Sequence, residues 1–251
     1  GLQERKRQAD IVSASEDGYP VAPLTAPELA TAKRVIETGN ADQKSAFAAA
    51  LNDGLGEDGL AELTPHLFKG EAKQRTFGIA AEVASQSPDT ARAIFVGQDI
   101  LDGRGGEKVS VMPPPADIVR KNQDMLYPVF DPFGTSDPKE VQQRQNLSAV
   151  TDRYQATTDA ALAYYAYAAR GQASPNFDRL MDQAINAVTG GVLNGPNGTK
   201  IMAPRRGLTQ NEFDGLWDNI NAGDLGEIAP ALNGQRISVE QVRSNGALQS
   251  V

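Results

Sequence analysis

At 251 residues the chain is long enough for one large domain or two small ones. Its hydrophobic content of 40% and charged content of 22% are ordinary for a globular protein, and this composition argues against disorder throughout the chain. The net charge of −8 argues against general binding of nucleic acid, because neutralising phosphates requires a basic surface. The absence of cysteine excludes disulfides, thiolate nucleophiles and cysteine-based metal sites.

Residues 1–24 are expected to form a flexible arm or linker. A charged N-terminal segment that includes Arg5-Lys6-Arg7 is followed by Ser, Gly and Pro residues without a sustained hydrophobic periodicity. Such a basic segment is interpreted as a solvated surface, with partner binding as the less favoured alternative.

Residues 25–104 are predicted to form an N-terminal helical subdomain. Thr25 and Glu28 fit a capping box, and Gly39 is placed to end the helix that follows. Asn40 is expected to cap a second helix over 41–51. The buried face of this second helix is predicted from its apolar positions, Ala46, Phe47, Ala50 and Leu51. Further helices are expected over 57–68, 71–85 and 88–103, which favours a stack of helical hairpins.

Residues 105–136 are predicted to be a loop-rich connection that contains one short helix, at 116–127. Gly105-Gly106 and Pro113–Pro115 cannot continue a helix. The strongest helical pattern is expected over 139–170, where the cluster Tyr164, Tyr165 and Tyr167 is interpreted as a packing face rather than a ligand platform.

Residues 137–251 are predicted to form a C-terminal helical domain with a small β element. After a helix at 175–188, short apolar strands at 192–193 and 200–202 flank a turn signal and predict a hairpin. Thr209 and Glu212 fit a second capping box. Residues 222–251 are expected to add a short helix, a turn at Asn233-Gly234, a helix at 239–244 and a final strand.

The predicted fold class is therefore mainly α, as helical hairpins or a bundle with a small β-hairpin or sheet near the C-terminus. No apolar run reaches the length of a bilayer span.

No complete catalytic or metal-binding set is found, so no catalytic, cofactor-binding or metal-ligating residue is assigned and no cofactor is expected. His66 is the single histidine, which argues against a catalytic triad or an imidazole-based metal site. Asp214 and Asp218 share one helical face, which is interpreted as a solvated acidic surface. The acidic stretch 52–59 does not have the spacing of a calcium loop, and 103–108 does not have the spacing of a phosphate loop. Other carboxylates are numerous, among them Asp58, Glu62, Asp99, Asp102, Asp131, Asp137 and Asp224.

A local basic spot beside the predicted hairpin is the one candidate binding site. Lys200, Arg205 and Arg206 contribute its charge. These side chains are expected to pair with acidic residues on the following helix or, as the less favoured alternative, to bind a carboxylate or phosphate of a partner.

Part of the chain resembles the C-terminal region of large virion-associated proteins of tailed phages and prophages, of the internal or ejection type. The most specific pattern lies within 190–216, and the resemblance extends over about residues 60–251. Its residues are Ala187-Val188-Thr189-Gly190-Gly191-Val192, Lys200-Ile201-Met202-Ala203-Pro204-Arg205-Arg206-Gly207-Leu208-Thr209 and Phe213-Asp214-Gly215-Leu216, with Ala91-Arg92-Ala93-Ile94-Phe95-Val96-Gly97-Gln98 and Ala160-Ala161-Leu162-Ala163-Tyr164-Tyr165-Ala166 upstream.

The resemblance implies a structural module of a phage or prophage virion that acts through protein–protein contacts. Its expected partners are other virion proteins or further copies of itself, and its expected location is the virion, or the bacterial cytoplasm during assembly. Some longer members of the family resemble fusions with lytic transglycosylase domains. The Glu-Ser and Gly-Leu-Met-Gln motifs of such an enzyme do not occur here. Enzymatic activity is therefore not the favoured interpretation, and a peptidoglycan hydrolase that uses carboxylates is kept as the alternative.

Overall fold

A computed structural model describes residues 24–104, 112–126, 148–195, 200–203 and 208–222, together with Glu4 and Val129. The described part is mostly helical with one small antiparallel sheet, as predicted for the fold class. Several predictions lie outside the described residues. These are most of the N-terminal arm, much of the connecting loop, the beginning of the long helix, Arg205, Arg206 and everything predicted after residue 222.

Backbone contacts group the chain into two units. The first unit comprises residues 1–114 and 152–184, and the second comprises 115–151 and 185–251. Residues 152–184 thus belong to the same unit as the N-terminal helices. The predicted domain boundaries at 24, 104 and 136 stay a prediction.

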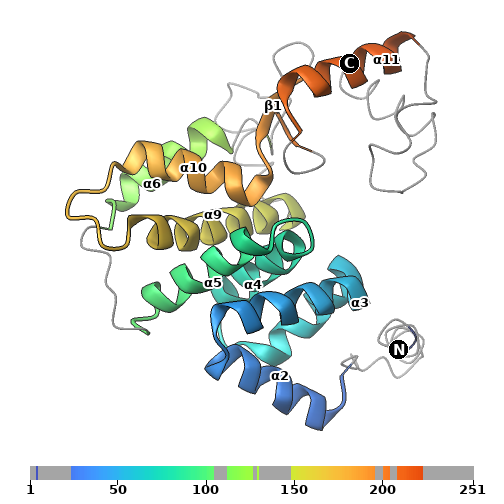
Figure 1. Ribbon diagram of the computed structural model, residues 1–251, viewed down its shortest axis with the longest axis vertical. Coiled ribbons are helices and arrows are strands. Elements are labelled where there is room, and N and C mark those ends of the chain that lie inside the picture. Colours follow the sequence, from blue (N-terminus) through green and yellow to red (C-terminus); the bar gives the residue numbers. More distant parts are fainter. Residues whose placement is uncertain are drawn as a thin grey trace. The chain divides into compact units, whose positions relative to one another are not determined.

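The first unit begins with helices α2 (Ala26–Thr38) and α3 (Ala41–Leu67), drawn in blue and cyan in Figure 1. Thr25 and Glu28 form the predicted capping box, in which the carboxylate accepts from the Thr25 backbone N–H at 2.9 Å. Asn40 caps α3 by accepting from the backbone N–H of Gln43, also at 2.9 Å. α3 runs through both ranges predicted as separate helices, and the break between them is a kink at Gly56, where φ is 68°.

The predicted buried face of this second helix is wrong in part. Ala46 and Ala50 are exposed, whereas Lys44 and Ala48 are buried. An alanine side chain carries little apolar surface, so alanine periodicity discriminates weakly between helix faces. The inward side of α3 instead follows Lys44, Ala48, Leu51 and Leu55 at helical spacing.

α4 (Glu71–Ala84) and α5 (Pro88–Leu101) pack against α3 and against each other. Their buried positions are mostly alanine and branched aliphatic residues, together with Thr76, and they include Phe77 and Phe95 at a ring separation of 5.9 Å. Gly70 before α4 has φ of 116°, a backbone conformation that favours glycine. Pro88 stands in the first turn of α5, where its missing N–H removes no helical hydrogen bond.

α9 (Ser148–Ala169) and α10 (Phe177–Thr189) are joined by a loop over residues 170–176, in which Gly171 has φ of 69°. Residues 152–184 of this pair belong to the first unit. Tyr165 is buried and contacts Phe177 edge-on, which confirms a packing role for this member of the tyrosine cluster.

The second unit includes α6 (Pro115–Met125), strands β1 (Val192–Asn194) and β2 (Lys200–Met202), and α11 (Gln210–Ala222). The two strands pair antiparallel with Leu193 opposite Ile201, as the predicted hairpin requires. Leu193, Leu208 and Phe213 form a small core between the hairpin and α11. Among the described helices, none is both long and apolar enough to cross a membrane.

Candidate functional site

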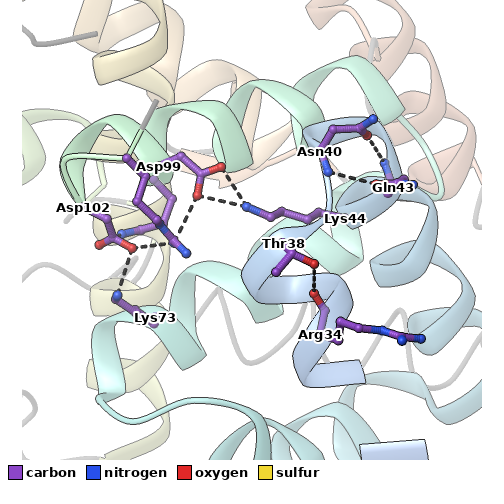
Figure 2. Close-up of polar contacts among 10 residues, drawn as sticks. Arg34, Thr38, Asn40, Gln43, Lys44, Lys73, Asp99 and Asp102 are labelled. Atoms are coloured by element: carbon purple, nitrogen blue, oxygen red, sulfur yellow. Dashed lines mark hydrogen bonds and ion pairs between the residues drawn. The ribbon is translucent and has the colours of Figure 1, made fainter. Parts of the chain in front are cut away.

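The main polar feature of the first unit is a cluster of charged side chains between α3, α4 and the end of α5. We call Lys44, Lys73, Asp99, Asp102 and Arg104 the charged cluster. Figure 2 labels Lys44, Lys73, Asp99 and Asp102 of this cluster. Its most buried member is Lys44, whose side chain is 5% exposed. Desolvation of an ammonium group is costly unless a counter-charge is close. The structure supplies that counter-charge from a helix 55 positions further along the chain.

Asp99 of α5 accepts both hydrogen bonds from the Lys44 amine, at 2.7 and 2.9 Å to its two oxygens. Ser45, next to Lys44, is buried as well, and its hydroxyl donates to the backbone carbonyl of Pro88 at 3.3 Å. The start of α3 is thereby attached to both ends of α5. A charge-assisted pair with both carboxylate oxygens engaged fixes orientation as well as separation.

Asp102, which caps the C-terminal end of α5, lies at the centre of the rest of the charged cluster. Its Oδ2 accepts from Lys73 of α4 at 2.8 Å and from Arg104 at 2.6 Å, and Gln98 donates to its Oδ1 at 3.0 Å. Arg104 also lies 3.0 Å from Asp99, so it bridges the two carboxylates. Gly103, with φ of 71°, turns the chain so that Arg104 comes back over the helix end.

The position of these carboxylates explains why cations surround them. The C-terminal end of a helix carries partial negative charge, so two aspartates in the last turn of α5 are unfavourable on their own. Burial acts to raise the pKa of Asp102, but the hydrogen bonds from Lys73 and Gln98 and the charges of Lys73 and Arg104 outweigh it and lower that pKa. Asp102 is therefore held in its ionised form.

A cleft lies beside the charged cluster. Lys44, Lys73, Asp99 and Arg104 line it on one part of its surface, and the aromatic rings of Phe68, Phe77 and Phe95 line another. The cleft is narrow, with a cavity volume of about 30 Å³, and Phe77 and Phe95 are themselves buried. It has room for little more than water.

A second set of ion pairs joins α4 to α9. Arg75 donates from Nε to Asp159 at 2.8 Å, and Arg153 binds both oxygens of Glu82. Burial raises the pKa of Asp159, and the hydrogen bond and charge of Arg75 oppose that effect without cancelling it. Arg75 and Glu82 are seven residues apart on α4 and their partners are six apart on α9, in the opposite order, so the pairs fix an antiparallel register.

The predicted basic spot is described only at Lys200. The Lys200 amine donates to the side-chain oxygen of Asn194 across the β1–β2 hairpin, rather than to an acidic residue of the following helix as expected. Arg205 and Arg206 lie outside the described residues. Binding of a partner at the basic spot stays a prediction.

Three other sequence candidates lie on the surface. His66 is exposed in the last turn of α3. Asp214 and Asp218 are both exposed on α11, and Asp214 accepts from Gln210 at 2.7 Å, consistent with a solvated face. Within the described ranges, no group of three or more His, Cys, Asp or Glu residues is arranged to hold a metal ion.

In the sequence, Asp99 and Asp102 are two among many acidic residues, and their cationic partners are not predicted. The one signal available was the Asp-x-x-Asp spacing at the end of a predicted helix, where anions oppose the helix dipole. That signal indicates that cations are needed, but it does not say which of the 24 Lys and Arg residues supply them.

The chain matches no protein-family model, and no match was found among curated proteins or solved structures.

Proposed function

We propose that this chain is a non-enzymatic interaction module that acts through protein–protein contacts, as a component of a phage or prophage virion. The observation that carries the proposal is the use of the charged side chains between the helices. Three ion pairs connect separate helices: Lys44 with Asp99, Lys73 with Asp102, and Arg75 with Asp159. Such pairs hold helix surfaces in a fixed arrangement, which suits docking of preformed surfaces because little ordering is left to occur on binding.

The virion assignment is supported by the location of the sequence pattern that resembles phage virion proteins. The described residues within 190–216 include the β1–β2 strands and the first half of α11, which share the small core of Leu193, Leu208 and Phe213. The pattern therefore corresponds to one packed element rather than to scattered positions. The solvated side of that element carries Asp214 and Asp218.

The alternative function, a peptidoglycan hydrolase, expects two carboxyl groups that share a cleft, one of them with a raised pKa. In the cleft beside the charged cluster, Asp99 is paired with Lys44 and Arg104. Asp159 does have a raised pKa, but its carboxylate is held by Arg75. These pairings favour the interaction module over the hydrolase.

The test is incorporation into particles. The host bacterium would carry the gene with an epitope tag, particles would be induced and banded by density, and the chain would be quantified by mass spectrometry. We expect co-banding with DNA-filled particles at a fixed copy number. Recovery of the chain only outside the particle band would contradict the proposal.

Matched charge reversals would test the predicted basic spot in the same assay. The triple variant Lys200→Glu, Arg205→Glu, Arg206→Glu is expected to reduce incorporation several-fold. The control Lys33→Glu, Arg34→Glu changes exposed basic residues of α2 and is expected to leave incorporation unchanged. Equal incorporation of both variants would remove the basic spot from the proposal while leaving the module itself in place.

The hydrolase alternative is tested separately. Purified chain would be incubated with peptidoglycan, and the release of soluble fragments would be measured. We expect no release above a heat-denatured control. If release occurs and Asp99→Asn or Asp159→Asn abolishes it, the interaction module is the wrong function.

A further inference from the structure

The first strand of the hairpin in the second unit ends on an Asn-Gly pair. Asn194 is the last residue of β1 and is exposed, and Gly195 follows directly after the strand. In such a pair the backbone nitrogen of the glycine can attack the side-chain amide carbon of the asparagine, because no β-carbon of the glycine shields that nitrogen. The pair is therefore a point of chemical lability as well as a turn signal.

Lys200 lies where negative charge develops in that reaction. It is the partner of Asn194 in the β1–β2 register, and its ammonium donates to the side-chain oxygen Oδ1 of Asn194. Attack on the amide carbon turns this oxygen into an oxyanion. A cation that is already hydrogen-bonded to the oxygen stabilises the oxyanion more than the neutral amide. The hairpin thus brings a group that promotes the attack into contact with the reacting amide.

Gln210, the first residue of α11, acts in the opposite direction. Its side-chain amide accepts from the Asn194 backbone N–H at 2.7 Å and donates to the Asn194 backbone carbonyl at 2.9 Å. These are the two bonds that a residue of a neighbouring strand makes, and they hold Asn194 in the extended conformation of β1. An extended backbone keeps the Gly195 nitrogen away from the amide carbon. The rotation that brings the two atoms together requires the bond between Gln210 and the carbonyl to break.

We propose that Asn194 is a deamidation site, at which the backbone nitrogen of Gly195 is the nucleophile, Lys200 stabilises the oxyanion and Gln210 slows the reaction by holding the strand extended. An intramolecular nucleophile one residue away has a large advantage over water, because little translational freedom is lost on attack. The reaction does not depend on the interaction-module function, so each can fail without the other.

The reaction proceeds through a succinimide and needs only water as a co-reactant. The Gly195 nitrogen loses its proton to solvent and bonds to Cγ of Asn194, and the bond from Cγ to Nδ2 breaks as ammonia leaves with a proton from water. Water then opens the succinimide ring. Opening at Cγ gives aspartate, and opening at the main-chain carbonyl gives isoaspartate. Either product places a carboxylate beside Lys200 and so lowers the positive charge of the predicted basic spot.

The experiment follows the side-chain amide of Asn194 in the whole folded chain, kept in mildly alkaline buffer for increasing times. Trypsin releases residues 180–200 as one peptide, and fragment ions separate Asn194 from Asn197 within it. Mass spectrometry measures conversion of the amide to the acid, with a zero-time sample as background. Labelling by an isoaspartyl methyltransferase measures the isoaspartate that only the succinimide route produces.

We expect conversion at Asn194 to a mixture of aspartate and isoaspartate. Asn211 is the internal control, because it is equally exposed but is followed by Glu212, whose side chain shields the backbone nitrogen. Asn211 is expected to remain an amide over the same period.

Variants separate the roles of the two neighbouring side chains. Gln210→Ala is expected to speed conversion about ten-fold, because two hydrogen bonds no longer hold the strand. In the Gln210→Ala background, Lys200→Met is expected to slow conversion several-fold, since the strand is released in both chains and only the cation differs. Lys33→Met changes an exposed lysine of α2 and is the matched control, with no expected effect on the rate. Circular dichroism of each variant verifies that the fold is kept.

Any of three results overturns the proposal. The first is an intact Asn194 in the folded chain over a period in which a synthetic peptide of residues 190–202 converts. The second is conversion to aspartate without isoaspartate, which would indicate direct hydrolysis by water. The third is a rate that does not rise in Gln210→Ala or does not fall when Lys200→Met is added to it.

Discussion

Gly97 of α5 lies directly against the main chain of Ala163 in α9. A Cβ atom at Gly97 would lie 2.5 Å from the carbonyl carbon of Ala163 and overlap its carbonyl oxygen, and it would lie 3.2 Å from the backbone nitrogen of Tyr167. Backbone atoms of a packed helix cannot move aside as a flexible side chain can. The contact therefore requires a residue without a side chain at this position.

Gly97→Ala is accordingly expected to lower the free energy of unfolding by about 1–3 kcal/mol, the usual cost of overpacking. Gly78→Ala on α4 is the matched control, because a Cβ there meets nothing within 4 Å. The control is expected to be stabilising by up to about 1 kcal/mol through helix propensity. Urea unfolding followed by circular dichroism measures both. If the two substitutions have the same sign, the close approach of α5 and α9 is wrong.

The pair Lys44–Asp99 is expected to respond asymmetrically to truncation. Lys44→Met removes the buried charge and leaves Asp99 with Arg104 at 3.0 Å, so we expect a loss of about 1 kcal/mol or less. Asp99→Asn leaves the Lys44 ammonium buried without its counter-charge, so we expect a loss of about 2–4 kcal/mol. Urea unfolding of both variants and of the double variant completes the cycle. A larger loss for Lys44→Met than for Asp99→Asn would contradict the described pairing.

The ion pairs between α4 and α9 predict rescue by charge exchange. Glu82→Arg alone places two cations together at Arg153, and we expect it to destabilise the chain by about 1–2 kcal/mol. Adding Arg153→Glu reverses the pair, and we expect it to recover at least half of that loss. Combining Glu82→Arg with Arg75→Glu is the mismatched control, since it makes the same change in charge but Arg75 pairs with Asp159 and not with Glu82. Recovery in the mismatched combination would show that the effect is not specific to the register.

Asp102 and Asp159 are expected to affect the pH dependence of stability with opposite signs. Because the pKa of Asp102 is lowered on folding, its stabilising contribution is present above about pH 4 and is lost as the pH falls through its folded-state pKa. Because the pKa of Asp159 is raised, its contribution is present at low pH and is lost as the pH rises through its folded-state pKa.

Urea unfolding between about pH 3 and about pH 6 tests this difference, since the unfolded-state pKa of an aspartate, about 3.9, lies in that range. Relative to the unaltered chain, Asp102→Asn is expected to lose less stability on acidification, and Asp159→Asn is expected to lose more. Identical slopes for the two variants would contradict the assigned directions of the pKa shifts.

Trp217 offers a local probe of the small core of the second unit. It is the single tryptophan of the chain, and its ring stacks on Phe213 at a centroid separation of 6.1 Å. Phe213→Leu removes the stacked ring and is expected to shift the tryptophan emission to longer wavelength, because more water reaches the indole. The exposed neighbour Asp214→Asn is the control and is expected to leave the emission unchanged. An unchanged spectrum in Phe213→Leu would contradict the described packing.

Much of the local structure follows from the sequence alone. The capping boxes at Thr25 and Thr209 and the β1–β2 hairpin were predicted correctly, because each depends on interactions between residues close together in the chain. The mainly α class follows in the same way from helical spacing and from the Gly and Pro residues that end helices. The finer functional prediction, a virion component, rests on a resemblance and stays a proposal.

Only the tertiary structure decided which helix faces meet. The sequence pattern placed Ala46 and Ala50 inward on α3, whereas the fold buries Lys44 and Ala48, because Asp99 reaches Lys44 from α5. The position of Gly97 against Ala163 depends likewise on how two distant helices cross. Local sequence fixes helix ends through contacts over three or four residues, but the partner of a buried charge is selected by packing across the whole unit.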